Sequence, residues 1–240
     1  MMNRERLRYS ATTHVGRVRK VNEDSILALP GLGVWLVSDG MGGHAAGDFA
    51  SQTVAESVAM LPEGLEPGEV MRAVRRAILD AHATISREAA ARGVATIGAT
   101  VVALILTDGH FVAFWAGDSR LYRLRDGRLD MLTTDHSLVG DLVTAGEMTW
   151  DEAEQHPQSN AITKAVGVGE RLNLDKIRGD VRSGDRFLLC SDGLNKYAGV
   201  ETLRRALVSA PIATVTDTLL NMALDGGGAD NISIIVVDIS

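Results

Sequence analysis

The most informative stretch of the chain is 34–46, where the residue pattern changes twice. Residues 34–37 are all apolar (Val-Trp-Leu-Val), and the run ends with Ser38 and Asp39. A glycine-rich loop follows, and after His44 the apolar residues recur at helical spacing. A short apolar run bounded by glycine is typical of a buried strand. We therefore predict a strand that carries the Asp39 carboxylate to its end, next to a loop whose backbone can approach a ligand closely.

Aspartates stand at the ends of three further apolar runs. Asp-Gly and Asp-Asn pairs also occur in ordinary turns, which would explain any one of them. Four carboxylates at strand ends are costly to gather unless a cation compensates them. The set therefore favours an all-oxygen metal site of the kind that suits magnesium or manganese. The three further pairs of run and aspartate are Phe111–Ala116 with Asp118, Phe187–Cys190 with Asp192, and Ile232–Val237 with Asp230.

Two periodicities divide the rest of the chain. Apolar residues at helical spacing predict helices over 47–61, 69–92, 200–208 and 212–224. Apolar and β-branched runs predict two short strands around a turn within 7–29, and strands over 34–38, 100–107, 110–116, 120–124, 186–191 and 232–239. Asp108-Gly109 and Asp126-Gly127 have the composition of tight hairpin turns. Because this order is not an alternating βαβ pattern, it favours an α+β fold with largely antiparallel sheet and segregated helices.

Residues 133–168 form a polar excursion from this pattern, with a short helical piece. Excursions of this length are usually functional or mobile. We see no internal repeat, low-complexity segment or linker, and we expect one domain over residues 1–240.

Composition excludes several classes of protein. The net charge of −7 and the pI near 5.4 argue against binding to nucleic acid or to an anionic membrane. The single cysteine, Cys190, excludes an internal disulfide and a cysteine-based zinc site, and its apolar neighbours predict a small buried side chain. No signal peptide is recognisable at the N-terminus, and the longest apolar run, Thr100–Leu106, is too short to span a bilayer. We expect a cytoplasmic protein without membrane insertion.

Two other functions have partial motifs in the chain. Residues 40–45 match the dinucleotide-binding pattern G-x-G-x-x-A, but the following helix leads into another helix and not into a parallel strand. A cysteine phosphatase would need Cys-x5-Arg, whereas Cys190 is followed six positions later by Lys196. A lysine cannot supply the bidentate fork that holds phosphate. We reject both.

A carboxylate-held metal cluster accounts for more of the residues. Two divalent ions about 3.5–4 Å apart can share a water and direct it at phosphorus in line with the leaving oxygen. Asp39 could bridge two ions beside the Gly40 carbonyl, and Asp192 and Asp230 could hold the other side. Arg19 suits a phosphate clamp, and His44 is a candidate general acid.

Motifs in a fixed order along nearly the whole chain carry a resemblance to a known family. The chain resembles bacterial PPM-family (type-2C) metal-dependent Ser/Thr protein phosphatases. The matching segments are V-R-K-V-N-E-D (18–24), D-G-M-G-G-H-A-A-G (39–47), G-A-T (98–100), G-D-S-R (117–120), D-H-S-L-V (135–139), H-P (156–157), G-D-R-F-L-L-C-S-D-G-L (184–194) and G-G-G-A-D-N-I-S (226–233).

The resemblance implies a four-layer α-β-β-α sandwich with a metal centre at one edge of two largely antiparallel sheets. Two core Mn²⁺ or Mg²⁺ ions are implied, with Asp39 as bridge and Gly40, Asp192 and Asp230 as further ligands. Asp118 matches the ligand of a third, weaker metal ion. Arg19 matches the phosphate-binding arginine, and Glu23 and Asp24 match acids that orient metal-bound water. Residues 133–168 match a mobile flap, thought to influence substrate choice.

Some positions depart from the family pattern. Ala99 replaces a usual Thr or Ser, which we expect to affect packing only, and Asn195-Lys196-Tyr197 replaces more usual acidic or small residues. His44 lies five residues after Asp39, whereas eukaryotic members carry the catalytic histidine two residues after it. His44 could therefore be a solvent-contacting residue at a helix start. His136 and His156 are expected to stabilise the flap.

The resulting hypothesis is a monomeric phosphatase that hydrolyses phosphoserine and phosphothreonine monoesters on proteins with a metal-activated water. Its partners would be phosphorylated proteins, either a Ser/Thr kinase or the substrates of that kinase. One alternative is a catalytically silent module that binds phosphoproteins, which should have lost a metal aspartate or the arginine. Another is a phosphatase for small phosphate esters.

Overall fold

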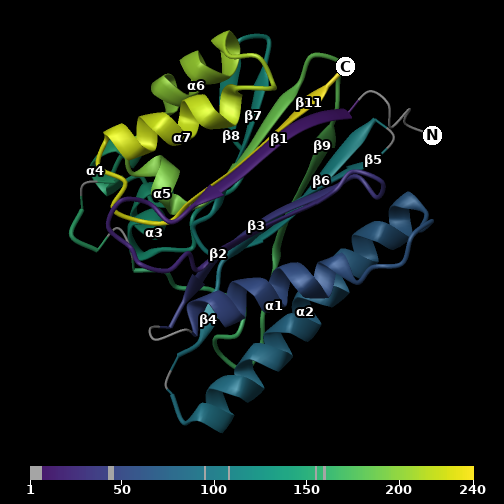
Figure 1. Ribbon diagram of the computed structural model, residues 1–240, viewed down its shortest axis with the longest axis vertical. Helices are drawn as coiled ribbons and strands as arrows, with labels where there is room; N and C mark the ends of the chain where they lie inside the picture. Colours follow the sequence, from purple (N-terminus) through teal and green to yellow (C-terminus); the bar gives the residue numbers. More distant parts are fainter. Residues whose placement is uncertain (1–6, 43–45, 95, 108, 155, 159–160) are drawn as a thin grey trace.

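The computed structural model describes residues 7–240 except 43–45, 95, 108, 155 and 159–160. Two antiparallel sheets stack face to face, and helices cover both outer faces (Figure 1). α6 (Val200–Ser209) and α7 (Val215–Asp225) lie on one side, and α1 (Gly47–Ala59) and α2 (Pro67–Arg92) on the other. This arrangement confirms the predicted α+β fold with four layers.

The first sheet brings the two ends of the described chain together. Its order is β1-β11-β10-β7-β8, and every neighbouring pair is antiparallel. β11 lies inside this sheet, between β1 and β10, so the closing strand completes its hydrogen bonding. The strands are β1 (Leu7–His14), β7 (Arg120–Arg125), β8 (Arg128–Met131), β10 (Arg186–Cys190) and β11 (Ile232–Ile239).

The second sheet contains the strand that carries Asp39. Its order is β2-β3-β5-β6-β9, and β4 pairs with the end of β3. The strands are β2 (Asp24–Leu29), β3 (Val34–Met41), β4 (Gly98–Ala99), β5 (Val101–Thr107), β6 (His110–Ala116) and β9 (Asp175–Asp180). β3 therefore lies between β2 and β5, and its pairing with both is antiparallel.

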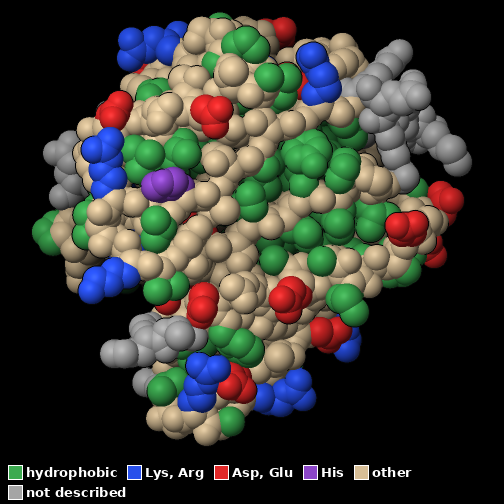
Figure 2. Space-filling view, in the orientation of Figure 1, with side chains coloured by type: hydrophobic (Ala, Val, Ile, Leu, Met, Phe, Trp, Pro, Cys, Tyr) green, Lys and Arg blue, Asp and Glu red, His purple; other side chains and the backbone are tan. Residues whose placement is uncertain are grey.

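Alternating side chains explain why the central strands are apolar at every position. In β3, Val34 and Leu36 pack toward α1 and α2, while Trp35 and Val37 pack between the two sheets. A strand buried on both faces needs no polar face, so its sequence reads as a continuous apolar run. Hydrophobic side chains also reach the surface across the middle of the face seen in Figure 2, along the edges where the two sheets meet.

The structure corrects several details of the predicted elements. The two strands within 7–29 exist, but they belong to different sheets: β1 pairs with β11, and β2 with β3. The polar stretch 133–168 contains two short helices, α3 (Leu138–Thr144) and α4 (Trp150–Glu154). Four short elements in the described part of the chain were not predicted: β4, β8, β9 and α5 (Asp192–Asn195). Their apolar patterns are too short to give a periodic signal.

The hairpin turn after β7 follows its predicted chemistry. Asp126 and Gly127 both have positive φ, +50° and +76°, as a two-residue type I′ turn requires. Gly109 has a positive φ as well, whereas its predicted partner Asp108 lies outside the described residues. No helix in the described part of the chain is long and apolar enough to cross a membrane.

Trp35 provides a test of the core between the sheets. Its side chain is fully buried, so Trp35→Ala should lower the free energy of unfolding by about 3–5 kcal/mol through lost burial and an unfilled cavity. Denaturant unfolding would measure this. Met60→Ala, at an 84% exposed position, is the control and should change stability by less than about 0.5 kcal/mol. Equal effects of the two substitutions would contradict the assigned core.

Candidate active site

Most of the predicted functional residues that the structure describes converge at one end of the sandwich, the end at which α3 and α5 lie (Figure 1). They surround a cavity of about 290 Å³. Contributions come from the end of β3, the loop between β1 and β2, the link between β6 and β7, α5 and the residues before β11. The lining residues are Arg19, Glu23, Asp39, Gly40, Met41, Gly42, Thr100, Asp118, Ile162, Asp192, Lys196, Asp230 and Asn231.

Thr100 fixes the backbone on either side of the first aspartate. Its N–H donates to the Asp39 carbonyl at 2.8 Å, and its Oγ1 accepts from the Asp39 N–H at 3.1 Å. The same Oγ1 lies 2.7 Å from Oγ of Ser119, the residue after Asp118. One threonine thus links the segments that carry Asp39 and Asp118. From the sequence, Thr100 is the start of a strand and the end of the G-A-T motif, with no predicted role in the site.

The glycines that follow two of the aspartates are required by close packing. A Cβ on Gly40 would lie 2.0 Å from the Gly47 carbonyl oxygen and 2.6 Å from that of Glu23. A Cβ on Gly193 would lie 1.9 Å from the Asn231 carbonyl oxygen. These contacts are far inside van der Waals distance. The repeated Ser-Asp-Gly sequence therefore lets neighbouring segments press against the backbone beside each carboxylate.

Asn231 holds the loop that carries Arg19. Its Nδ2 donates to the carbonyls of Val15 and Val21, at 2.9 and 3.0 Å, and its Oδ1 accepts from the Glu23 N–H at 2.8 Å. Both ends of the segment 15–23 are therefore attached to the residue that follows Asp230. From the sequence, Asp230-Asn231 is a possible turn within the motif at 226–233, and nothing there predicts that Asn231 holds the segment 15–23.

Burial and mutual repulsion dominate the electrostatics of the carboxylates. Burial raises the pKa of Asp39 well above its usual value, and the charges of Asp24 and Asp192 raise it further. Burial likewise raises the pKa of Asp118, with Asp192 as the next cause. One oxygen of Asp192, Oδ1, is buried without a hydrogen-bond partner.

Two basic side chains, Arg19 and Lys196, partly compensate the charges of Asp192 and Asp230. Arg19 Nε lies 2.9 Å from Asp230 Oδ1, and its Nη2 donates to Oδ2 at 3.0 Å. Lys196 Nζ lies 2.7 Å from Asp192 Oδ2 and 3.3 Å from Asp230 Oδ2. Burial opposes ionisation of Asp230, but Lys196 and Arg19 outweigh it, and the pKa of Asp230 is lowered.

The donor set suits a divalent cation that prefers oxygen. Asp39, Asp118, Asp192 and Asp230 all line the cavity. The unpartnered Asp192 oxygen and the raised pKa values of Asp39 and Asp118 are what a cation would relieve. Among the residues that the structure describes, no three acidic, histidine or cysteine side chains are close enough to form a ready-made cage. The side chains fit the metal by chemistry, and a bound ion would have to draw them inward.

The remaining predicted residues occupy distinct places. Glu23 lines the cavity, whereas Asp24 lies behind it, opposite Asp39 in the β2–β3 pairing, and accepts from Ser191 Oγ at 2.8 Å. His44, the candidate acid, lies outside the described residues. Cys190 is fully buried, as its neighbours predict.

The base of the excursion at 133–168 is closely tied to the site. His136 forms two hydrogen bonds with Gly117, the residue before Asp118. The ring Nδ1 of His136 accepts from the Gly117 N–H at 3.1 Å, and the backbone N–H of His136 donates to the Gly117 carbonyl at 3.0 Å. Its ring stacks on Trp115. Ile162, from the same excursion, lines the cavity. The predicted stabilising role of His136 therefore agrees with its contacts, while His156 accepts a local hydrogen bond from the Gln158 N–H.

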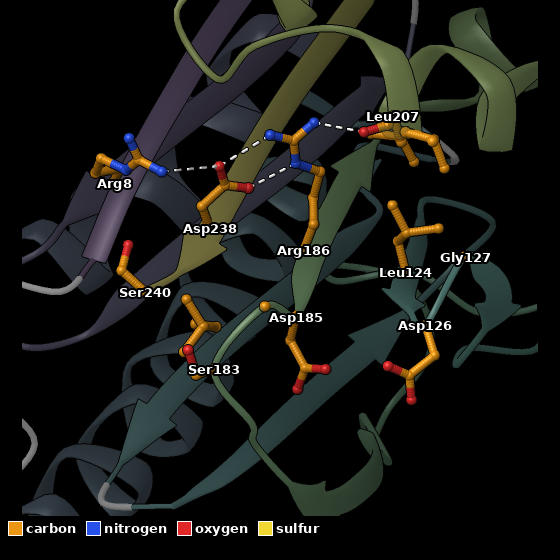
Figure 3. Close-up of a pocket in the computed structure, with 13 residues that line it drawn as sticks. Arg8, Leu124, Asp126, Gly127, Ser183, Asp185, Arg186, Leu207, Asp238 and Ser240 are labelled. Carbon is orange, nitrogen blue, oxygen red and sulfur yellow. Dashed lines mark hydrogen bonds and ion pairs between the residues drawn. The ribbon is translucent and has the colours of Figure 1, made fainter.

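A second cavity, of about 490 Å³, is larger but chemically less suited to catalysis (Figure 3). Arg186 and Asp238 form a two-point ion pair there, and Arg8 approaches Asp238 as well. Asp185 also lines this cavity and forms an ion pair with Arg125, which is not one of the lining residues. Because these opposite charges neutralise one another, the smaller, acidic cavity is the candidate active site.

Comparison with known proteins shows the family to which the chain belongs. The family described as Protein phosphatase 2C matches residues 13–226. The chain belongs to the protein phosphatase 2C family. It is 36% identical over 234 residues to the Serine/threonine protein phosphatase PstP of Mycobacterium tuberculosis, covering 97% of this chain and 45% of PstP. It is 33% identical to Protein phosphatase PhpP of Streptococcus pneumoniae, covering 96% of this chain and 97% of PhpP. The chain thus spans about half the length of the mycobacterial relative.

Solved structures of the protein phosphatase 2C family share the whole fold. PppA, described as a key regulatory component of T6SS in Pseudomonas aeruginosa, superposes with a TM-score of 0.90 at 40% identity and covers 98% of both chains. The catalytic domain of PstP, solved in complex with two manganese ions, gives a TM-score of 0.83 at 35% identity, with 97% of this chain and 98% of that one covered. These matches confirm the predicted family and fold.

The raised pKa of Asp24 predicts how stability depends on pH. Burial raises its pKa to about 7, against hydrogen bonds from Ser233 and Ser191, while in the unfolded chain it should be near 3.8. The folded protein therefore holds this proton more tightly. In EDTA, the free energy of unfolding should fall as pH rises from about 4 to about 7, because over this range the unfolded chain releases the proton while the folded protein still holds it. Asp24→Asn should flatten this fall in denaturant unfolding, and an unchanged slope would contradict the assignment.

Proposed function

We propose that this protein is a metal-dependent phosphatase that hydrolyses phosphoserine and phosphothreonine monoesters on proteins. The observation that carries the proposal is a single cavity lined by Asp39, Asp118, Asp192 and Asp230 together with Arg19. Such a set of carboxylates suits divalent metal ions, and an arginine suits the phosphoryl group of a substrate. Membership of the family and the relatives named as Ser/Thr protein phosphatases support the same reaction.

Each residue of the site has a defined part in this proposal. Asp39 and the Gly40 carbonyl, together with Asp192 and Asp230, would hold two Mn²⁺ or Mg²⁺ ions, and Asp118 with Asp192 a third. Bound metal ions supply the activation of a water molecule and the neutralisation of phosphoryl charge. Glu23 lines the cavity and Asp24 lies opposite Asp39 in the β2–β3 pairing, and both acids would orient metal-bound water. His44 stays a candidate for protonating the leaving oxygen.

Arg19 is suited to bind the phosphoryl group. Its side chain is half exposed at the cavity rim, with Nε and Nη2 directed at Asp230. A guanidinium presents a planar pair of donors to two phosphoryl oxygens, so the same fork that now holds Asp230 can hold a phosphate. Arg19 would thereby fix the phosphorus atom next to the carboxylates.

The size of the cavity favours a phosphorylated side chain on a protein. At about 290 Å³ it lies at the lower end of ligand pockets. A phosphoryl group with a short seryl or threonyl stem fits this space, and the rest of the substrate would lie outside on the protein surface. We infer that the partner is a Ser/Thr kinase or a substrate of that kinase, and that the protein acts as a monomer. A catalytically silent module is less favoured, because the three core aspartates and Arg19 all line one cavity.

The direct test is hydrolysis of p-nitrophenyl phosphate and of a phosphothreonine peptide, with EDTA, Mg²⁺ and Mn²⁺ in parallel. Metal-dependent release of phosphate from both substrates is expected. Release from p-nitrophenyl phosphate alone would favour small phosphate esters as substrates. No release with any metal would instead favour the phosphoprotein-binding module.

Asp39→Asn should reduce kcat/KM for both substrates by roughly a thousandfold or more, because it removes the charge that would bridge two metal ions. It should also weaken Mn²⁺ binding measured by isothermal titration calorimetry. Asp126→Asn is the matched control: it removes a carboxylate in a hairpin turn, where asparagine tolerates the positive φ. Near-normal turnover in Asp39→Asn would refute the site.

Asp118→Ala should slow turnover about tenfold to a hundredfold while the two core ions stay bound, since Asp118 is assigned to the third ion only. The metal content after gel filtration, measured by mass spectrometry at a fixed low Mn²⁺ concentration, gives the number of tightly bound ions. Loss of both core ions from this variant would show that Asp118 belongs to the core site.

A further inference from the structure

Lys196 occupies an unusual place for a basic residue, between two carboxylates assigned to a metal ion. Its Nζ lies 2.7 Å from Asp192 Oδ2 and 3.3 Å from Asp230 Oδ2. Of the residues that line the cavity, Arg19 and Lys196 are the basic ones. Arg19 contacts Asp230 from the rim, whereas Lys196 contacts both aspartates. Lys196 also lies in the segment 195–197, where the sequence departs from the family pattern.

The backbone holds Lys196 close to these carboxylates. Its N–H donates to the Asp192 carbonyl at 3.1 Å, so lysine and aspartate share one helical turn at α5. The next residue, Tyr197, accepts from the Ala229 N–H at 3.0 Å through its hydroxyl oxygen, which attaches this turn to the residue before Asp230. The lysine side chain is flexible, but its Cα is fixed near both carboxylates.

A positive charge at this position should have two opposite effects. It relieves repulsion between Asp192 and Asp230 when no metal ion is bound. It also repels an incoming cation and engages one oxygen of each ligand, so that a metal ion must displace the ammonium group. The other oxygen of Asp192, Oδ1, is buried without a partner, which shows that the lysine satisfies this carboxylate only in part.

We infer that Lys196 is a built-in counter-ion that holds Asp192 and Asp230 together before metal loading and competes with the metal ion for them. The lysine would thereby lower the affinity of the ligands Asp192 and Asp230 for Mn²⁺ and stabilise the folded protein when metal is scarce. This inference rests on the proposed metal centre and concerns how tightly that centre binds its ions.

The test is a Mn²⁺ titration of the full chain by isothermal titration calorimetry, with Lys196→Met beside the wild type. Removing the competing charge should tighten Mn²⁺ binding at least about tenfold, since two ligands are released. In EDTA the same substitution should lower the melting temperature, because the two aspartates lose their shared counter-ion. Lys196→Arg, which keeps the charge, should stay close to the wild type in both measurements.

Lys164→Met is the matched control. Lys164 is also a partly buried lysine in an ion pair: its side chain is 29% exposed, against 27% for Lys196, and its Nζ lies 2.7 Å from Asp175 Oδ1. Lys164 Nζ also lies 3.0 Å from His136 Nε2, and neither contact involves a carboxylate assigned to metal. Lys164→Met should therefore leave the Mn²⁺ affinity unchanged, even if it lowers the melting temperature.

The outcomes separate this inference from the function on which it rests. If the wild type binds Mn²⁺ in a way that Asp39→Asn weakens, and Lys196→Met binds it equally or more weakly, the role of Lys196 is refuted and the metal centre stands. If the wild type binds no Mn²⁺, the proposed metal centre itself fails. Tighter binding in both Lys196→Met and Lys164→Met would reflect net charge alone and would also refute the inference.

Discussion

Repulsion among closely placed carboxylates is the constraint on which the rest of the site depends. Asp39 and Asp118 have raised pKa values because burial and neighbouring acids oppose their ionisation. Such a cluster persists only when the surrounding backbone is fixed strongly enough to oppose it. Thr100 and Asn231 supply that rigidity: Thr100 joins the segments of Asp39 and Asp118, and Asn231 attaches the loop of Arg19 to the segment of Asp230. The stability of the two sheets is thus used to hold charges that would otherwise separate.

The sandwich explains how residues nearly two hundred positions apart reach the same cavity. β3 ends beside Asp39 in one sheet, while β10 ends before Asp192 and β11 begins after Asp230 in the other. β10 and β11 are antiparallel neighbours, so the end of one and the start of the next meet at the same edge. The apolar layer between the sheets, which includes Trp35 and Phe187, sets the distance between the two groups of acids. Packing in the core therefore determines the geometry of the site.

The sequence predicted the carboxylates and the fold class, and it missed the residues that hold them. Aspartates at the ends of apolar runs are visible because a buried strand has a strong pattern and its last residue stands out. Thr100 and Asn231 give no such signal, since their hydrogen bonds join segments distant in the sequence. The helices at 47–61 and 69–92 appear nearly as predicted. The short strands β4, β8 and β9 were missed because neighbouring strands, rather than a pattern of their own, place them, and α5 was missed because four residues carry no periodicity. The sequence did show that Lys196 departs from the family pattern. It did not show that the lysine side chain lies between Asp192 and Asp230.

The excursion at 133–168 is anchored by charge at the point where it leaves the sheet. Arg120 and Asp135 form a buried ion pair with Nη2 to Oδ2 at 2.8 Å, and the guanidinium lies over the Trp150 ring at 4.7 Å. Arg120 also donates to the hydroxyl of Tyr122, which reaches Asn195 beside Lys196. A buried pair of this kind adds little net stability, because desolvation offsets the attraction, but it permits only one arrangement of its partners. The base of the excursion, the segment of Asp118 and the turn that carries Lys196 are therefore fixed relative to one another through buried polar contacts.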